Sequence, residues 1–316
     1  MSYQFEVTPH DEGRRLDSLL RSRWPALPLG AMMKYFRKGQ VRVDGKRADY
    51  KTRVCAGSQV YVPWESPEAV GRERGADGKT HLGKLDVLYQ DDYVLVVNKP
   101  AGLLSQPDSP GEDSLTTRAL AYAKADYLPQ LCHRLDRNTS GVVMLARDGR
   151  ALREMMALFK ARQVDKKYLA LVCGQAPKQG RIDAPLLKDS DKKLVRVDPA
   201  GESALTTYRR IDGNGELSLL EVTLHSGRTH QIRAHLNHAG LPLVGDRKYG
   251  DFSRKKELKA LGAKRPMLHA LSLALGEVGE PMAHLSGKKW VAPLSGDFKK
   301  LVLDLGLNFS VNEGED

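Results

Sequence analysis

Apolar and polar positions in residues 13–62 predict a small unit of two helices and a hairpin sheet. An apolar stripe at helical spacing in residues 16–20 indicates the first helix, and Ala31–Arg37 indicates the second, with Gly39 placed to end it. VRVDGKR (41–47) alternates apolar and polar residues around an Asp-Gly pair, which is a strong hairpin turn signal. VCAGSQVYVP then predicts a further strand. About 50 residues hold only a modest core, which favours an appended module over an independent enzyme.

Residues 63–82 break this pattern. Prolines and glycines lie among charged residues there, a composition typical of an exposed linker. Trp64, near the start of the segment, is expected to hold its first residues against one of the flanking domains. We therefore expect an N-terminal domain (1–62), a linker (63–82) and a main domain (83–316).

The main domain mixes strands and helices, and many of its strands follow one another directly. VLYQDDYVLVVNKP predicts two strands around an Asp-Asp turn, and GVVMLAR, KKYLALVCG and LSLLEVTLHSG predict three more. LTTRALAYA and ALREMMALFKARQ predict helices. Because neighbouring strands often lack an intervening helix, we expect an α+β fold with a largely antiparallel sheet, and not a doubly wound parallel one.

Composition fits a globular protein and excludes several other classes. Of the 316 residues 41% are hydrophobic and 28% charged, which argues against a disordered or fibrous chain. No apolar run exceeds six residues and the N-terminus lacks the apolar core of a signal peptide, so we expect neither a membrane span nor secretion. The three cysteines, Cys55, Cys132 and Cys173, are too widely spaced for a disulfide framework, which indicates a cytoplasmic location.

The net charge of +11 is concentrated near the N-terminus. Residues 1–62 hold twelve Lys or Arg against six Asp or Glu, so about half of the excess lies in about a fifth of the chain. Such a concentration is expected of a protein that binds a phosphate backbone. A solvated surface tuned for solubility would carry the same charge, and charge alone does not decide between the two.

The segment HRLDRNTSG (133–141) carries the most chemical information. Asp136 lies in a polar loop with arginines within two positions on either side, so it is well placed to stay ionised and to face a polyanion. Thr139 and Ser140 can fix the loop through backbone hydrogen bonds, and Gly141 permits a tight turn into the following strand. On composition alone, a surface ion-pair cluster is the commoner arrangement.

HRLDRNTSG resembles the signature motif of the RluA-type pseudouridine synthases. Further motifs of that family recur in the usual order, namely VLYQDDYVLVVNKPAG (Val87–Gly102), Lys166–Tyr168, GRTHQIRAH (Gly227–His235), GLPLVGDRKYG (Gly240–Gly250) and Leu268–Ala270. The resemblance covers roughly residues 83–305 and implies the pseudouridine synthase catalytic fold, with a mixed central sheet and a cleft. RRLDSLL, RKGQVRVDGKR and AGSQVYVP resemble the S-four-like RNA-binding domain, a small α/β domain often fused to these enzymes.

The resemblance implies roles for individual residues. In this family the bond from the ribose to nitrogen 1 of uracil is broken, the base rotates, and it is rejoined through carbon 5. Asp136 would be the catalytic carboxylate, Arg233 its ion-pair partner, and Tyr168 the residue that stacks on the uracil and accepts the proton from carbon 5. Leu268 would line the base pocket. The reaction needs no cofactor or metal, and the chain carries no P-loop or dinucleotide motif.

Several basic residues are candidates for RNA contacts. The target base must leave its helix, and the resemblance implies that Arg134 occupies the vacated stack. Further contacts are expected from basic residues of the N-terminal domain: Arg14, Arg15, Lys34, Arg37 and Lys38. The segment RKKELKALGAKR (254–265) is expected to form an exposed amphipathic helix with Leu258 and Leu261 facing inward, either contacting RNA or simply solvated.

Four histidines lie within fourteen positions: His225, His230, His235 and His238. Their spacing does not place them on one helical face and forms no HExxH pattern, so a zinc site, and with it a metal-dependent hydrolase, is a minor alternative. We expect His133, His230 and His269 to orient neighbouring groups around the cleft instead.

These observations predict an RNA pseudouridine synthase that acts on uridines of large-subunit ribosomal RNA. We expect a monomer without cofactor or membrane attachment. One alternative is a transfer-RNA pseudouridine synthase. Another is a non-catalytic RNA-binding assembly factor on the same fold, against which the presence of Asp136, Tyr168 and Arg233 counts.

Overall fold

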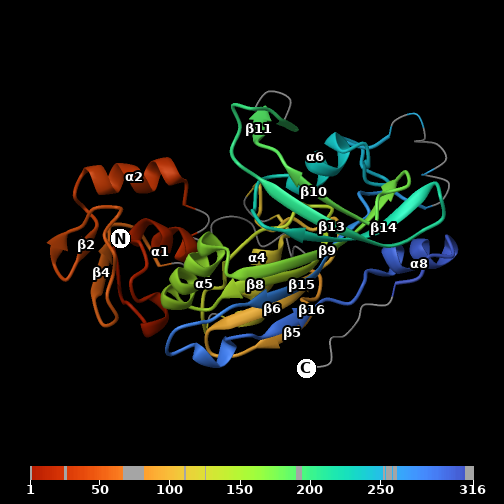
Figure 1. The fold of residues 1–316 in the computed structure, drawn as a ribbon. Helices are drawn as coiled ribbons and strands as arrows, with labels where there is room; N and C mark the ends of the chain where they lie inside the picture. The colour runs from red at the N-terminus through yellow and green to blue at the C-terminus, as the bar shows by residue number, and fades with distance from the viewer. Residues whose placement is uncertain are drawn as a thin grey trace.

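The N-terminal residues form a four-stranded antiparallel sheet packed with two helices (Figure 1). The computed structural model describes residues 2–24, 27–66, 82–109, 112–124, 126–189, 194–251, 253, 258 and 262–309. In sheet order the strands are β1 (Tyr3–Glu6), β4 (Gln59–Val62), β2 (Arg42–Val43) and β3 (Lys46–Arg47). The turn η1 (Pro9–Asp11) precedes α1 (Leu16–Arg23) and α2 (Leu29–Arg37). The sequence pattern missed β1 because four residues are too few to show an alternation.

The helix and turn signals in residues 13–62 correspond to the helices and the turn of this unit. The leucine stripe of α1 is fully buried, and Gly39 follows α2 with a φ of +66° while its N–H bonds the Phe36 carbonyl at 2.9 Å. Asp44 and Gly45 both have positive φ in the turn between β2 and β3. Trp64 is buried in this core, where its ring lies 5.8 Å from that of Trp24. The first residues of the expected linker therefore pack on the N-terminal side, while 67–81 lie outside the described residues.

The main domain is built on a ten-stranded sheet (Figure 1). Its order is β10 (Gln179–Asp183), β13 (Leu205–Gly213), β14 (Leu217–Leu224), β9 (Val164–Cys173), β15 (Leu268–Leu275), β8 (Ser140–Ala146), β6 (Val94–Lys99) and β5 (Val87–Gln90), with β16 (Lys289–Val291) on β15 and β7 (Gln130–Leu131) on β8. Among the described strands, β8 and β15 alone pair in parallel. The mixed, largely antiparallel α+β fold is confirmed.

Helices and one further hairpin surround this sheet. They are α4 (Leu115–Ala123), α5 (Gly149–Ala161), α6 (Gln231–His238), η2 (Ala283–Leu285), α8 (Gly296–Asp304), and the hairpin β11 (Leu186–Asp189) with β12 (Leu194–Val197). Ser114 and Thr117 form a capping box at α4, and Asp148 caps α5, so both predicted helices begin at a side chain that satisfies the first free N–H groups. No helix in the described ranges is long and apolar enough to cross a membrane.

The segment 254–265 differs in part from the expectation. Most of it lies outside the described residues, so the expected helix, including Leu261, is left as an expectation. Leu258 is buried in the cluster that also holds Phe298 and Leu301 of α8. Arg265, expected on an exposed basic face, is buried instead, because its guanidinium pairs with Asp297 at 2.7 Å.

Candidate active site

The HRLDRNTSG loop joins β7 to β8 and is fixed by hydrogen bonds at both ends. The Ser105 hydroxyl donates to the Leu135 carbonyl at 2.8 Å and accepts from the Leu135 N–H at 3.2 Å. The Thr139 N–H closes a turn onto the Asp136 carbonyl at 3.1 Å. Asp136 therefore projects from a loop whose backbone is held on either side of it.

Lys99 lies beneath this loop and is fully buried. Its ammonium donates to the carbonyls of Leu103 (2.7 Å), Pro100 (3.1 Å) and Arg137 (3.1 Å). Burial lowers the pKa of Lys99 to about 7, an effect that the Asp136 charge opposes. The end of β6 is thereby tied to the backbone of the residue after Asp136, a contact that the NKP sequence did not reveal.

A second cation, Arg265, holds the other side of the Asp136 loop by hydrogen bonds. It donates to the Asn138 carbonyl at 3.1 Å and to the Leu268 carbonyl at 3.3 Å, while its other nitrogens pair with Asp297 of α8. Arg265 therefore connects the loop, the start of β15 and the C-terminal helix.

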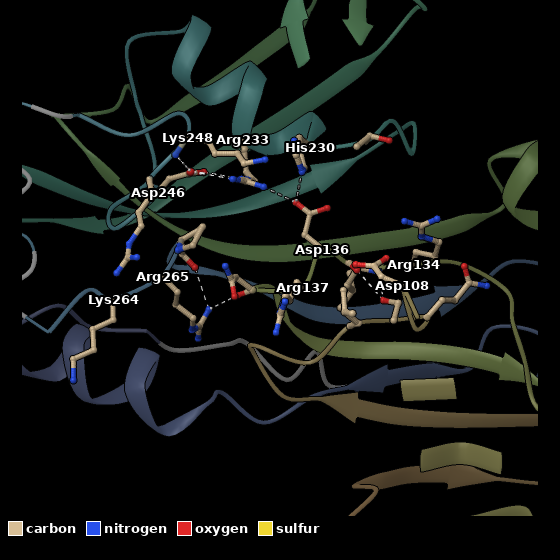
Figure 2. Close-up of a pocket in the computed structure, with 18 of the residues that line it drawn as sticks. Asp108, Arg134, Asp136, Arg137, His230, Arg233, Asp246, Lys248, Lys264 and Arg265 are labelled. Carbon is tan, nitrogen blue, oxygen red and sulfur yellow. Dashed lines mark hydrogen bonds and ion pairs between the residues drawn. The ribbon is translucent and has the colours of Figure 1, made fainter. Parts of the chain in front are cut away.

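Three charged side chains form the centre of the site (Figure 2). An Nη of Arg233 lies 3.0 Å from Oδ2 of Asp136, and its Nε and second Nη contact Asp246 at 2.6 and 3.0 Å. Burial alone would lower the pKa of Arg233, but the hydrogen bonds and charges of Asp246 and Asp136 raise it. The Arg233 guanidinium thus stays charged. The fully buried carboxylate of Asp246 orients it toward the carboxylate of Asp136, which is 28% exposed. The structure brings together Asp136 and Arg233 as the sequence motifs suggested.

Asp136 lies where two cavities meet. A cleft of about 680 Å³ is lined by the loop, by α6 residues and by the segments before and after α6. A smaller pocket of about 80 Å³ shares Arg134, Asp136 and Arg233 with it and reaches inward to Tyr168 and Leu268. Both of these inner side chains are buried and lie on the neighbouring strands β9 and β15. The pocket is therefore a narrow, partly apolar recess beside a carboxylate, at the base of a wide polar cleft.

Tyr168 is a phenol in this environment. Burial raises its pKa, and the negative charge of Asp136 raises it further. A phenol whose pKa is raised is a weak proton acceptor at neutral pH, so acceptance of a proton by its oxygen requires that the hydroxyl proton leave at the same time.

Cations flank Asp136 on both sides of the cleft (Figure 2). Arg134 is exposed and lines both the cleft and the pocket. The other exposed cations along the cleft are Arg137, Arg247, Lys248 and Lys264. This arrangement suits a polyanion that passes over the pocket.

Asp246, Tyr249 and Lys99 were missed as site residues. The motif GDRKYG holds the first two, and its position after α6 was the available signal, but sequence order does not show that the Asp turns back onto Arg233. Tyr249 is buried, and its hydroxyl lies 2.9 Å from Nδ1 of His230. His230 in turn places Nε2 3.8 Å from Oδ2 of Asp136.

The basic residues of the N-terminal domain divide into two groups. Lys34, Arg37 and Lys38 are exposed on α2 and the residue after it, and Arg15 is exposed while paired with Asp17. Arg14 is buried, with its guanidinium 3.1 Å from Asp11 and 2.9 Å from the Ser22 hydroxyl. The expectation that Arg14 contacts RNA is wrong, because this side chain is buried and forms an internal ion pair with Asp11.

Four of the other histidines make internal hydrogen bonds. His235 contacts the Thr206 hydroxyl and the Ala184 carbonyl, and His225 contacts the Thr207 hydroxyl. His269 contacts the Ser140 hydroxyl at 2.9 Å, and His133 accepts from the Met144 N–H at 3.1 Å, so both orient β8. In the part of the chain that the structure describes, no three His, Cys, Asp or Glu side chains gather as metal ligands would.

Comparisons with known proteins point to one family. Residues 93–238 match the family model described as RNA pseudouridylate synthase. "Ribosomal large subunit pseudouridine synthase C" of Vibrio parahaemolyticus is 31% identical over 302 residues, 93% of each chain. The protein of the same name from Escherichia coli K12 is 33% identical over 284 residues, 86% of this chain and 88% of the relative.

A solved structure agrees with these matches. "Human RNA Pseudouridylate Synthase Domain Containing 4" aligns with a TM-score of 0.59 at 29% identity, over 71% of this chain and 94% of the human one. Residues 93–238, which match the family model, hold both the loop that carries Asp136 and helix α6, which carries Arg233. The chain belongs to the RNA pseudouridylate synthase family.

Proposed function

We propose that the protein isomerises uridine to pseudouridine in large-subunit ribosomal RNA. The observation that carries the proposal is the Asp136 carboxylate, paired with Arg233 at the junction of a wide polar cleft and a small recess lined by Tyr168 and Leu268. A flipped-out base enters such a recess while its backbone stays in the cleft. The names of the relatives from Vibrio and Escherichia support ribosomal RNA as the substrate.

The residues of the site fit the steps of this isomerisation. Asp136, paired with Arg233, acts on the flipped nucleotide as the bond to nitrogen 1 breaks. Tyr168 and Leu268 enclose the uracil while it rotates and rejoins the ribose through carbon 5. The Tyr168 oxygen accepts the proton from carbon 5 as its own proton passes toward Asp136. Asp136 passes the proton that it receives to nitrogen 1, so the proton lost from carbon 5 balances the one gained there and no external reagent is consumed.

Other cations would hold the RNA. Arg134, exposed at the mouth of the pocket, is placed to stack where the base was, since its planar guanidinium can replace a base in a stack. Lys34, Arg37 and Lys38 would contact the phosphate backbone without reading sequence. In this proposal residues 1–62 act as an S-four-like RNA-binding domain attached by the 63–82 linker to the catalytic domain.

Replacement of Asp136 by Asn tests the catalytic assignment. Asn keeps the shape and loses the charge, so we expect pseudouridine formation to fall by at least about 1000-fold with RNA affinity nearly unchanged. Pseudouridine is measured by mass spectrometry of digested RNA after single-turnover reactions. The control is Asp92→Asn, which removes a carboxylate that is 97% exposed in the β5–β6 turn and should retain full activity. An Asp136→Asn enzyme with most of its turnover would refute the assignment.

The substrate is tested by mapping pseudouridines in cells with and without the protein. Loss of one or more positions from large-subunit ribosomal RNA is the expected result. Loss from transfer RNA would instead support the alternative substrate. If no position is lost while the protein still binds RNA, it is a non-catalytic assembly factor.

A further inference from the structure

His230 occupies a strained position between the catalytic carboxylate and a buried tyrosine. It is the residue before α6 and has a φ of +53°, in the left-handed region that non-glycine residues rarely adopt. Its side chain makes no capping hydrogen bond to the helix. The ring instead directs Nδ1 to the Tyr249 hydroxyl at 2.9 Å and Nε2 to Asp136 at 3.8 Å (Figure 2 shows His230 above Asp136). Backbone strain of this kind persists where the surroundings hold a side chain in a working position.

The hydrogen bonds of Tyr249 determine the tautomer of this histidine. The Val195 N–H of β12 donates to the Tyr249 oxygen at 2.7 Å. Burial raises the pKa of Tyr249, so the phenol keeps its proton and must donate it. Among the described residues, Nδ1 of His230 is the acceptor that the hydroxyl faces. Nδ1 is then unprotonated, and the ring proton lies on Nε2, on the side of Asp136.

We propose that His230 is a positioning residue for Asp136, held by Tyr249 in the neutral tautomer whose Nε2–H faces the carboxylate. This inference rests on the proposed function. The 3.8 Å contact is longer than a hydrogen bond in the free protein, and such contacts often tighten when substrate is bound. Arg233 already donates to the same Oδ2, so His230 adds a second donor that fixes the direction of the carboxylate. Because Val195 lies in the β11–β12 hairpin, that hairpin also supports the catalytic centre.

The charges around His230 give the proposal a pH signature. Asp136 faces the ring from the loop, Arg233 from α6, and Asp246, Lys248 and Tyr249 from the segment after α6. Burial lowers the pKa of His230, an effect opposed by Asp136 and assisted by Arg233 and Lys248, so the imidazole is neutral at pH 7. Below that pKa an imidazolium forms beside Asp136 and engages the carboxylate as a full ion pair. Turnover should therefore fall on the acid side in a manner that depends on His230.

The tautomer is measured on the full-length protein by NMR with nitrogen-15-labelled histidine. The two ring nitrogens of the neutral forms differ in chemical shift, and His230→Asn identifies the His230 signals by their absence. We expect the Nε2–H form at pH 7 in the wild type and a mixture of tautomers in Tyr249→Phe. Tyr122→Phe, on the exposed face of α4, is the matched control and should leave the signals unchanged. An Nδ1–H form in the wild type would overturn the proposal.

Kinetics test whether the arrangement matters for turnover. Asn tolerates the left-handed backbone but lacks a donor at the Nε2 position, whereas Gln restores a donor there that does not titrate. We expect His230→Asn to lower kcat by about 10- to 100-fold with little change in KM for RNA. His230→Gln should recover part of kcat, and both variants should lose the acid-side fall. Wild-type kcat and pH profile in both variants would refute the positioning role. A wild type that forms no pseudouridine would refute the proposed function instead, and the tautomer measurement would stand.

Discussion

Gly141 has no side chain at the point where β8 pairs with β15. Its φ is +118°, and a Cβ placed there would collide with the Ala270 carbonyl oxygen, which belongs to the paired strand. Any side chain at this position would push apart the two strands from which the loop and Leu268 extend. The glycine of the signature motif is therefore required by packing as well as by the turn.

Gly141→Ala should destabilise the protein by more than backbone strain alone. We expect a loss of at least about 3 kcal/mol in the free energy of unfolding, because strain and overpacking add. Urea denaturation measures it. Gly287→Ala is the control: its φ is +70° and nothing lies within 4 Å of the added Cβ, so it should lose only about 1 kcal/mol. Equal losses at both positions would show that the collision is relieved.

Lys99→Met should also be costly, although it keeps an apolar stem of similar length. Three carbonyls, of which that of Leu103 makes a buried hydrogen bond, lose their shared donor, so we expect a loss of about 2–4 kcal/mol in the free energy of unfolding. Lys289→Met on β16, where the side chain is exposed, should change stability by less than about 0.5 kcal/mol. A loss of similar size in both variants would show that the carbonyls find other donors.

Residues that stand in a family motif could be identified from the sequence. Residues whose role depends on whether the side chain is buried could not. Asp136, Arg233, Tyr168 and Leu268 stand in motifs, and they line one pocket. Arg14 was misjudged because a count of charges does not tell a buried cation from an exposed one. Its partner Asp11 lies only three residues earlier, but nothing in that spacing shows that both side chains face the core.

At the scale of elements, Arg265 connects the loop that carries Asp136 to α8. Its side-chain hydrogen bonds lower the pKa of Asp297, the second residue of α8, to about 2. A carboxylate whose pKa is lower in the folded than in the unfolded chain stabilises the fold above its unfolded pKa of about 4. This stabilisation is lost as the pH falls from about 4 through about 2.

Asp297→Asn should therefore be less stable than the wild type at pH 7 and equal to it near pH 2. The midpoint of urea unfolding, measured across this range, gives the difference. Asp304→Asn, at the other end of the same helix, removes an exposed pair with Lys300 and should shift the midpoint only slightly at any pH. A constant difference between Asp297→Asn and the wild type down to pH 2 would contradict the assignment to ionisation.

Elements specified by local signals could be predicted, and pairings between distant segments could not. The strands around the Asp-Asp turn and helix α4 agree with the pattern because period and capping residues lie within a dozen positions. The parallel pairing of Ser140 with His269 joins segments more than a hundred residues apart. No periodicity in either strand encodes that partner, although the order of the family motifs was consistent with it.

At the scale of the molecule, charge and chemistry lie in different places. The exposed cations of α2 belong to the unit with the four-stranded sheet. This unit contacts the rest of the chain where the Glu12 carbonyl accepts a hydrogen bond from Arg153 of α5 at 3.4 Å. The Asp136 carboxylate and the pocket lined by Tyr168 and Leu268 belong to the segments around the ten-stranded sheet. General affinity for RNA and turnover should therefore respond to different substitutions.

The triple change Lys34→Gln, Arg37→Gln and Lys38→Gln tests this separation. RNA binding should weaken, and the slope of log affinity against log salt should become shallower by about 2, since fewer counterions are released. Single-turnover rates at saturating RNA should stay within about twofold. The control removes three exposed lysines from β16 and α8, namely Lys289, Lys299 and Lys300. A similar decrease in slope for both triples would show that the charge acts without regard to position.

Strand β15 completes the sheet late in the order of synthesis. It lies between β9 and β8, so the strands made earlier form two separate groups until residues 268–275 leave the ribosome. The pocket has residues from both groups, with Asp136 before β8 and Tyr168 on β9. Contacts of such sequence separation form slowly. A nascent chain halted before residue 268 should therefore lack the pocket that joins Asp136 and Tyr168, and the new enzyme has this pocket only after most of its own translation is complete.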